Sequence, residues 1–134
     1  MTVDMSLMEY LASEFTCQDG SVIIEEGSKG DWLYVLLEGY AKVKKRTPKG
    51  MVIIDTLKPG DIFGEIAFLE GETASRSATV VAAEGPVKVG ILDKESLAGQ
   101  YNEMSPMLRA LTRSLATKLR ETTSKICSTL VAQE

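Results

Sequence analysis

The chain has 134 residues, of which 44% are hydrophobic and 25% are charged, the size and composition of one globular domain. Its formal net charge of −4 argues against direct nucleic-acid binding, which relies on Lys and Arg to neutralise phosphates. Histidine is absent. Hydrolases and oxygenases built on small β-barrels need His as a metal ligand or general base, so we expect no enzyme, no catalytic residues and no metal site.

The sequence also predicts a location. No stretch approaches the roughly 18 to 20 apolar residues of a membrane helix. The first ten residues, MTVDMSLMEY, lack the basic start and apolar centre of a signal peptide, so we expect a cytoplasmic protein that does not contact a membrane. Cys17 and Cys127 fit no metal or redox spacing and are expected to be reduced thiols.

The first segment of the chain carries a helical pattern. Ser6 and Glu9 have the Ser-x-x-Glu spacing of a capping box, and Leu7, Tyr10 and Leu11 recur behind Ser6 at helical intervals. This pattern predicts a short N-terminal helix.

From residue 15 to about residue 93 the sequence consists of short β-rich runs separated by turn residues. The runs are SVII, DWLYVLL, YAKVKKR, MVIIDTL, SATVVAA and VKVGIL, and the turns include Gly39, Pro59-Gly60 and Gly85-Pro86. Short strands at such regular spacing predict a sandwich, a jelly roll or a barrel.

A second helical pattern follows the β-rich part. Pro106 suits the first turn of a helix, and apolar residues then recur every three, four or seven positions to form one stripe: Leu108, Leu111, Leu115, Leu119, Ile126 and Leu130. A helix of about 25 residues spans nearly 40 Å, which is longer than a small β-domain covers. We therefore expect a homodimer that meets through this stripe.

The stretch FGEIAFLEGETASRSATVVA, which starts at Phe63, predicts an anion site. The first N–H groups of a short helix after Gly64 are available to a phosphate, and Arg76 offers a forked, charge-assisted contact. Glu65 would repel that anion unless another group of the ligand donates to it, and a ribose 2′-hydroxyl does so. Phosphate and ribose together indicate a nucleotide.

These residues resemble the phosphate-binding cassette of the cyclic nucleotide-binding domains, in which Phe-Gly-Glu, a short apolar helix and a loop precede Arg-x-Ala-Thr. The matching residues here are Phe63-Gly64-Glu65 and Arg76-Ser77-Ala78-Thr79. The resemblance implies a mainly β fold with flanking helices, a β-roll of the jelly-roll type. It divides a single domain of residues 1–134 into an N-terminal helix (1–14), a β-roll (15–94) that contains the cassette (63–79), and C-terminal helices (95–134).

The resemblance also implies a role for each site residue. Glu65 would accept a hydrogen bond from the ribose 2′-hydroxyl, and Arg76 would pair with the cyclic phosphate. The C-terminal helix resembles that of the bacterial catabolite activators, where a hydroxyl pair reads the adenine amino group; Thr122 and Thr123 stand at the matching place. Backbone N–H groups would complete the phosphate site at Gly64, Ile66, Ala67, Ser77 and Ala78. The implied ligand is cAMP, or less favourably cGMP, with no other cofactor.

Several of these features also have a purely structural interpretation, without a ligand. Glu65 and Arg76 would form an ordinary surface ion pair, the threonines would bond their own helix carbonyls, and the basic run at 42–49 would be a solvated strand face. Two other functions stay open: an interaction module that kept the roll but binds no nucleotide, and a cupin-type enzyme, which the lack of His disfavours. Substitution of Arg76 by Ala separates the sensor from the interaction module.

Overall fold

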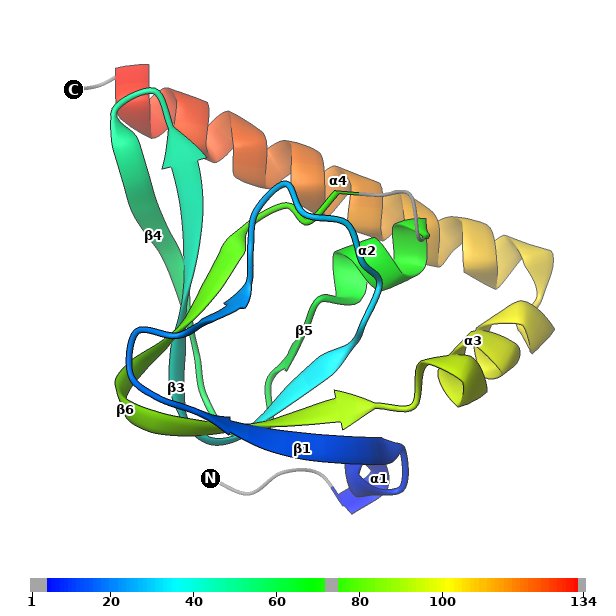
Figure 1. The fold of residues 1–134 in the computed structure, drawn as a ribbon. Helices are drawn as coiled ribbons and strands as arrows, with labels where there is room; N and C mark the ends of the chain where they lie inside the picture. Colours follow the sequence, from blue (N-terminus) through cyan, green and yellow to red (C-terminus); the bar gives the residue numbers. More distant parts are fainter. Residues whose placement is uncertain (1–4, 72–74, 133–134) are drawn as a thin grey trace.

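The computed structural model describes residues 5–71 and 75–132. The middle of the chain consists mainly of strands, and helices lie at both ends of the chain (Figure 1). The strands are β1 (Leu11–Cys17), β2 (Val22–Ile24), β3 (Tyr34–Thr47), β4 (Gly50–Leu57), β5 (Ile62–Phe63) and β6 (Thr79–Leu92). The helices are α1 (Met5–Met8), α2 (Glu65–Glu70), α3 (Lys94–Glu103) and α4 (Pro106–Ala132).

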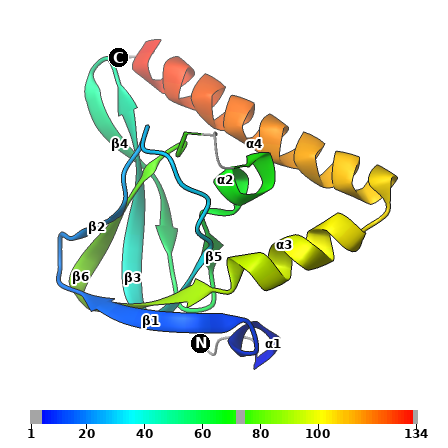
Figure 2. The ribbon, with the colours of Figure 1, turned by 45° about the vertical axis from the view of Figure 1, so that its right-hand side comes forward.

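The strands form one antiparallel sheet that curls into a roll. The order β1-β6-β3-β4 runs through the two longest strands, and β2 pairs with β6 while β5 pairs with β3. This confirms the expected mainly β fold with flanking helices. α4 runs along one side of the roll with α2 beneath it (Figures 1 and 2).

The two longest strands differ from the sequence prediction. Gly39 and Gly85-Pro86 were expected to separate strands, but each lies inside a single strand of 14 residues, β3 and β6. The pairing shifts there from Leu36↔Val89 to Tyr40↔Ala83, and the two glycines have φ of 85° and 109°. Glycine in these conformations bends a strand without ending it, and the bends let the sheet curl.

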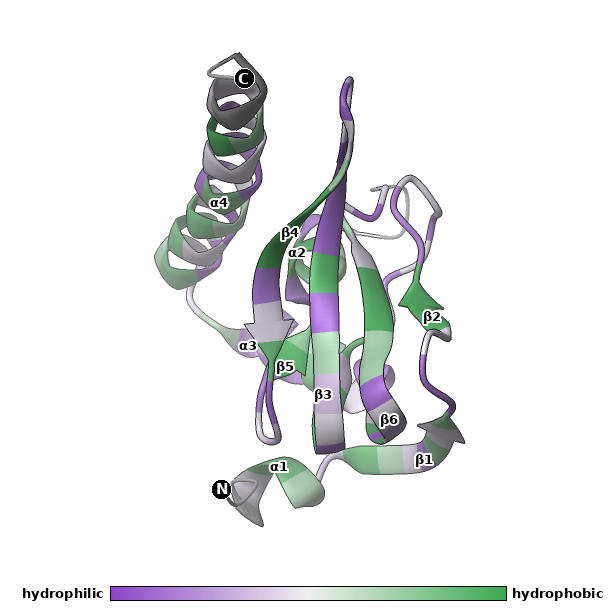
Figure 3. Ribbon diagram, turned by 90° about the vertical axis from the view of Figure 1, so that its left-hand side faces the viewer, coloured by the Kyte–Doolittle hydropathy of each residue, from purple (hydrophilic) through white to green (hydrophobic). Residues whose placement is uncertain are grey.

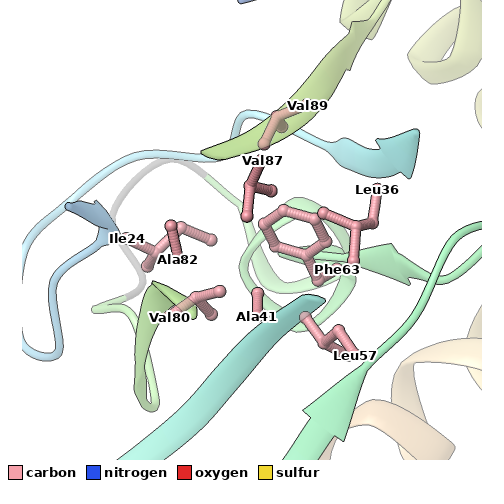
Figure 4. Close-up of a cluster of buried hydrophobic side chains, with 9 residues drawn as sticks. All are labelled: Ile24, Leu36, Ala41, Leu57, Phe63, Val80, Ala82, Val87 and Val89. Atoms are coloured by element: carbon pink, nitrogen blue, oxygen red, sulfur yellow. The ribbon is translucent and has the colours of Figure 1, made fainter. Parts of the chain in front are cut away.

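The main core lies inside the roll (Figure 4). Nine buried side chains from β2, β3, β4, β5 and β6 pack together: Ile24, Leu36, Ala41, Leu57, Phe63, Val80, Ala82, Val87 and Val89. A second cluster of Leu33, Val35 and Leu92 packs against α1, α2 and α3 through residues such as Leu7, Phe68 and Leu97. The short helix α2 is therefore held on the same core as the strands.

The N-terminal helix is shorter than predicted. α1 ends at Met8, Ser6 lies within α1 instead of capping it, and residues 1–4 lie outside the described part of the chain. Leu11 begins strand β1 and pairs with Leu92. The prediction of a helix over residues 1–14 is wrong from Glu9 onwards: residues 9 and 10 form a turn, and from Leu11 the sheet pairing of β1 with β6 outweighs a weak helical periodicity.

The C-terminal part contains helices, as expected, and Pro106 is the first residue of α4. Hydrophobic and hydrophilic residues alternate along α4 (Figure 3). Its buried residues are Ala116 and Cys127, whereas the apolar stripe is about half exposed at Leu108, Leu111, Leu115, Leu119 and Ile126. The side chain of Leu130 lies outside the described part. No helix within the described ranges is long and apolar enough to cross a membrane.

Candidate functional site

A cavity of about 640 Å³ lies between the roll, α2 and α4, a size within the usual range for small-molecule sites. Eight of the nine predicted site residues line it: Gly64, Glu65, Ile66, Ala67, Arg76, Ser77, Ala78 and Thr123. Thr122, the ninth, is exposed and does not line the cavity. The structure therefore brings the two ends of the cassette and one face of α4 to a common space.

Gly64 sets the geometry of the cassette at the start of α2. Its φ of 86° is left-handed, and a Cβ there would lie 2.8 Å from the Trp32 carbonyl oxygen and 2.9 Å from Arg76 Nη1. Only glycine fits both the backbone conformation and the space. The first N–H groups of a helix have no acceptor within it, so the Gly64 cap aims the start of α2, at Ile66 and Ala67, toward the cavity.

Arg76 is buried, with 6% of its surface exposed. Among the described residues its guanidinium donates to the carbonyl oxygens of Trp32, at 3.0 Å, and Gly64, at 3.3 Å. Its Cζ lies 5.9 Å from the centre of the Tyr34 ring. An arginine has five N–H donors, so the guanidinium is fixed in direction while donors remain for an anion in the cavity.

Burial also affects the ionisation of Arg76. It lowers the pKa of the guanidinium from its ordinary value, and the electrostatic influence of Tyr34, Asp31 and Glu65 acts in the opposite direction. Arginine remains protonated despite such shifts. The site therefore holds a buried positive charge, which is costly unless an anion compensates it.

Glu65 is the first residue of α2 and the acidic group of the cavity. Burial raises the pKa of its carboxyl, while the hydrogen bond from its own backbone N–H and the charge of Arg76 partly oppose this. Its Oε2 is buried and has no hydrogen-bond partner among the described residues. An unpaired buried acceptor is costly, and a hydroxyl donor in the cavity would satisfy it.

The segment that carries Arg76 is held by the turn before β3. Arg76 N–H donates to the Ser28 carbonyl at 2.8 Å, and Gly27 N–H donates to the Arg76 carbonyl at 2.9 Å. Glu26 N–H donates to Thr79 Oγ1 at 2.9 Å. These bonds fix the backbone on both sides of Ser77 and Ala78, whose N–H groups were predicted to face a phosphate.

Sequence reasoning missed Lys45 and Glu26. Lys45 was placed in a solvated basic run, but its side chain is only 16% exposed. Its Nζ donates to the Ser77 carbonyl at 2.8 Å and to Glu26 Oε2 at 3.2 Å, and Glu26 Oε1 accepts from Arg46 N–H at 2.8 Å. Lys45 stands between Lys44 and Arg46 in a run of basic residues, so nothing local distinguished it. Its pairing with Glu26 appears only in the fold.

The far wall of the cavity comes from α4 and β4. α4 contributes Leu119, Thr123, Ile126 and Cys127, and β4 contributes Ile54 to Leu57. Thr123 is half-buried on the inner side of α4, while Thr122 faces outward. Among the described residues, Thr112 donates to the Leu108 carbonyl and Thr129 to the Lys125 carbonyl, whereas Thr122 and Thr123 make no such bond. Thr123 therefore presents a hydroxyl to an otherwise largely apolar wall.

The family model of the cyclic nucleotide-binding domain matches residues 14–103. The chain belongs to the cyclic nucleotide-binding domain family. The matched residues begin within β1, include β2 to β6, α2 and α3, and end before α4. The family assignment thus rests on the same roll and cassette that form the cavity.

Two curated relatives have regulatory names. A CRP-like cAMP-activated global transcriptional regulator of Mycobacterium tuberculosis is 28% identical over 108 residues, which are 80% of this chain and 47% of the relative. A cAMP-dependent protein kinase regulatory subunit of Yarrowia lipolytica is 38% identical over 111 residues, 81% of this chain and 28% of the relative. The chain thus spans less than half the length of either.

Solved structures with bound cyclic nucleotides are also similar to this chain. The EAL enzyme Bd1971 with cAMP and cyclic-di-GMP bound superposes with a TM-score of 0.78 at 26% identity, over 85% of this chain and 30% of that one. Its cGMP-bound form superposes with a TM-score of 0.73 at 27% identity, over 81% and 28%. The fold of this chain therefore occurs in a protein whose structure was solved with cAMP and with cGMP.

Proposed function

We propose that the chain is a cyclic nucleotide sensor that binds cAMP. One observation carries the proposal: a buried guanidinium with donors to spare and a buried carboxylate oxygen without a partner share one cavity. A cyclic phosphate compensates the charge of Arg76, and a ribose 2′-hydroxyl supplies the donor that Glu65 lacks. A cyclic nucleotide carries both groups on one rigid pair of fused rings.

We place cAMP before cGMP. The relatives from Mycobacterium tuberculosis and Yarrowia lipolytica are named for cAMP, whereas the EAL enzyme was solved with each nucleotide. Thr123 is the polar residue that α4 contributes to the cavity wall. We assign its hydroxyl to hydrogen bonding with the base of the nucleotide.

Occupancy reaches α4 because α4 forms part of the cavity wall. A ligand that contacts Thr123 favours arrangements in which α4 lies against the roll, in proportion to its difference in affinity between arrangements. We assign the exposed stripe from Leu108 to Ile126 to contact with a second copy of the chain. Ligand occupancy would then change the arrangement of a homodimer. The domain acts by binding alone, in the cytoplasm and without catalysis.

The second candidate is an interaction module that binds no nucleotide. The half-exposed apolar stripe of α4 favours it, because soluble proteins rarely leave such a surface open without a partner. Under this alternative the buried charge of Arg76 serves only to hold Trp32 and Gly64.

Calorimetric titration tests the two functions. Wild-type protein is titrated with cAMP, cGMP and 5′-AMP, and the Arg76→Gln variant with cAMP, after circular dichroism and thermal melting have established its fold. We expect saturable binding of cAMP, weaker binding of cGMP, and affinity at least about 30-fold lower in the variant. No heat with either cyclic nucleotide refutes the sensor and leaves the interaction module.

A further inference from the structure

Arg120 connects α4 to the cassette without lining the cavity. Its Nε donates to Glu70 Oε1 at 2.8 Å, its Nη2 lies 2.5 Å from the same oxygen, and Nη2 also donates to the Ser75 carbonyl at 2.9 Å. Glu70 is the last residue of α2, and Ser75 directly precedes Arg76. One guanidinium of α4 thus binds the cassette at the end of its helix and beside its arginine.

These contacts are stronger than an ordinary surface ion pair. The side chains of Arg120 and Glu70 are only 26% and 23% exposed, so solvent screens them less than an exposed pair. Two N–H groups of Arg120 meet one carboxylate oxygen, and a third contact satisfies a backbone carbonyl. All three exist only while α4 lies against the cassette.

The other polar side-chain bonds of α4 do not reach the cassette. Within the described residues, Thr112 and Thr129 bond carbonyls of α4 itself. Arg109 bonds the carbonyls of Asn102 and Met104, at the end of α3. Arg120 is therefore the polar connection between the described parts of α4 and of the cassette, and it stands one position after Leu119 and one turn before Thr123, both on the cavity wall.

We propose that Arg120 is a positioning residue for nucleotide binding, which holds the cavity-lining turn of α4 on the cassette. The proposal rests on the proposed function. When only a fraction of molecules has α4 in place, the apparent dissociation constant rises by the inverse of that fraction. The contacts of Arg120 raise that fraction before the ligand arrives. They also oppose the departure of α4 once the ligand is bound, so their loss speeds dissociation more than it slows association.

The test compares cAMP binding to Arg120→Met and to Lys118→Met. Lys118 is an exposed cation two residues away on α4, with no ion pair among the described residues. Rates of association and dissociation are measured with a fluorescent cAMP analogue at neutral pH. We expect Arg120→Met to raise the dissociation constant about five- to tenfold, mainly through the dissociation rate, and Lys118→Met to change it less than about twofold.

Two further variants separate positioning from a general loss of stability. Glu70→Gln removes the same ion pair from the cassette side and should weaken binding in the same way. The exchanged pair Arg120→Glu with Glu70→Arg should recover part of the affinity lost in Arg120→Glu alone, which a merely destabilised helix would not do. Melting temperatures of the ligand-free variants show whether each is folded.

The outcomes separate this inference from the proposed function. If wild type binds cAMP and neither Arg120→Met nor Glu70→Gln weakens it beyond Lys118→Met, the positioning role is refuted while the sensor stands. If wild type binds no cyclic nucleotide, the sensor itself fails and the positioning role fails with it.

Discussion

The Gly64 carbonyl accepts a hydrogen bond from Arg76 Nη1 at 3.3 Å, and a Cβ on Gly64 would lie 2.9 Å from that same nitrogen. The residue that caps α2 and the residue that follows the cassette loop thus share one confined space. The position of the guanidinium depends on the absence of a side chain at residue 64.

Gly64→Ala should therefore impair both stability and binding. A left-handed non-glycine residue costs about 1–2 kcal/mol, and crowding against Arg76 and the Trp32 carbonyl adds about 1–3 kcal/mol. We expect the free energy of unfolding in urea to fall by the sum of these terms, and cAMP affinity to fall with the displacement of Arg76.

Gly20 provides a matched control for this variant. Its φ of 84° nearly equals the 86° of Gly64, but a Cβ there would meet nothing within 4 Å. Gly20→Ala should lose only the conformational part, about 1–2 kcal/mol, and keep wild-type affinity. Equal losses of stability and affinity in the two variants would contradict a steric role for Gly64.

The ionisation of Glu65 predicts a pH dependence of stability. Burial raises the pKa of its carboxyl in the folded protein above the value of about 4.3 in an unfolded chain. Between these two values the folded protein binds more protons than the unfolded chain, so this group lowers the free energy of unfolding as the pH rises. Glu65→Gln removes the effect, and the stability gained by the variant over wild type should grow from pH 4 to pH 7 in thermal melts.

The same carboxylate predicts a preference for ribose. Wild type should bind cAMP about tenfold more tightly than 2′-deoxy-cAMP, the worth of one charge-assisted hydrogen bond. Glu65→Gln should narrow this preference, and cAMP binding by wild type should weaken at low pH as Glu65 is protonated. A preference for cAMP that persists undiminished in Glu65→Gln would place the ribose elsewhere.

Thr122 and Thr123 are neighbours on α4 but should differ in their contribution to cAMP binding. Thr123 lines the cavity and Thr122 is exposed. Thr123→Val, which keeps the shape and removes the hydroxyl, should weaken cAMP binding up to about tenfold, the worth of one hydrogen bond. Thr122→Val is the control and should leave the calorimetric affinity unchanged; the reverse pattern would mean that α4 is rotated in the bound protein.

The cassette could be predicted from the sequence because its chemistry is local. Phe63-Gly64-Glu65 encodes a left-handed turn followed by a helix start, and Arg76 stands before a strand, so one short stretch contained seven of the eight predicted residues that line the cavity. The assignment of Thr122 required the rotation of α4 about its axis. That rotation depends on how Ala116 and Cys127 pack on the roll, which spacing along one helix does not give.

The remaining misses concern contacts between distant segments. Lys45 and Glu26 meet across 19 residues, and Arg120 and Glu70 across 50, so their ion pairs exist only in the folded chain. Leu11 follows a helical pattern, but its partner in β6 is Leu92, and sheet pairing decided its structure. The length of α4 predicted that its apolar stripe would be exposed, but the residues that the roll covers instead, Ala116 and Cys127, emerged only from the fold.

That exposure predicts self-association through α4. Leu115 is 61% exposed at the middle of the stripe, and its side chain would be buried in a helix pair, where loss of an apolar side chain costs about 2–5 kcal/mol. Leu115→Gln should convert a dimer to a monomer in light scattering coupled to gel filtration, at concentrations where wild type is dimeric. Lys118→Gln, a change on the same helix outside the stripe, is the control. Because Leu115 does not line the cavity, the monomeric variant should still bind cAMP; a wild type that is monomeric at every concentration would exclude a homodimer.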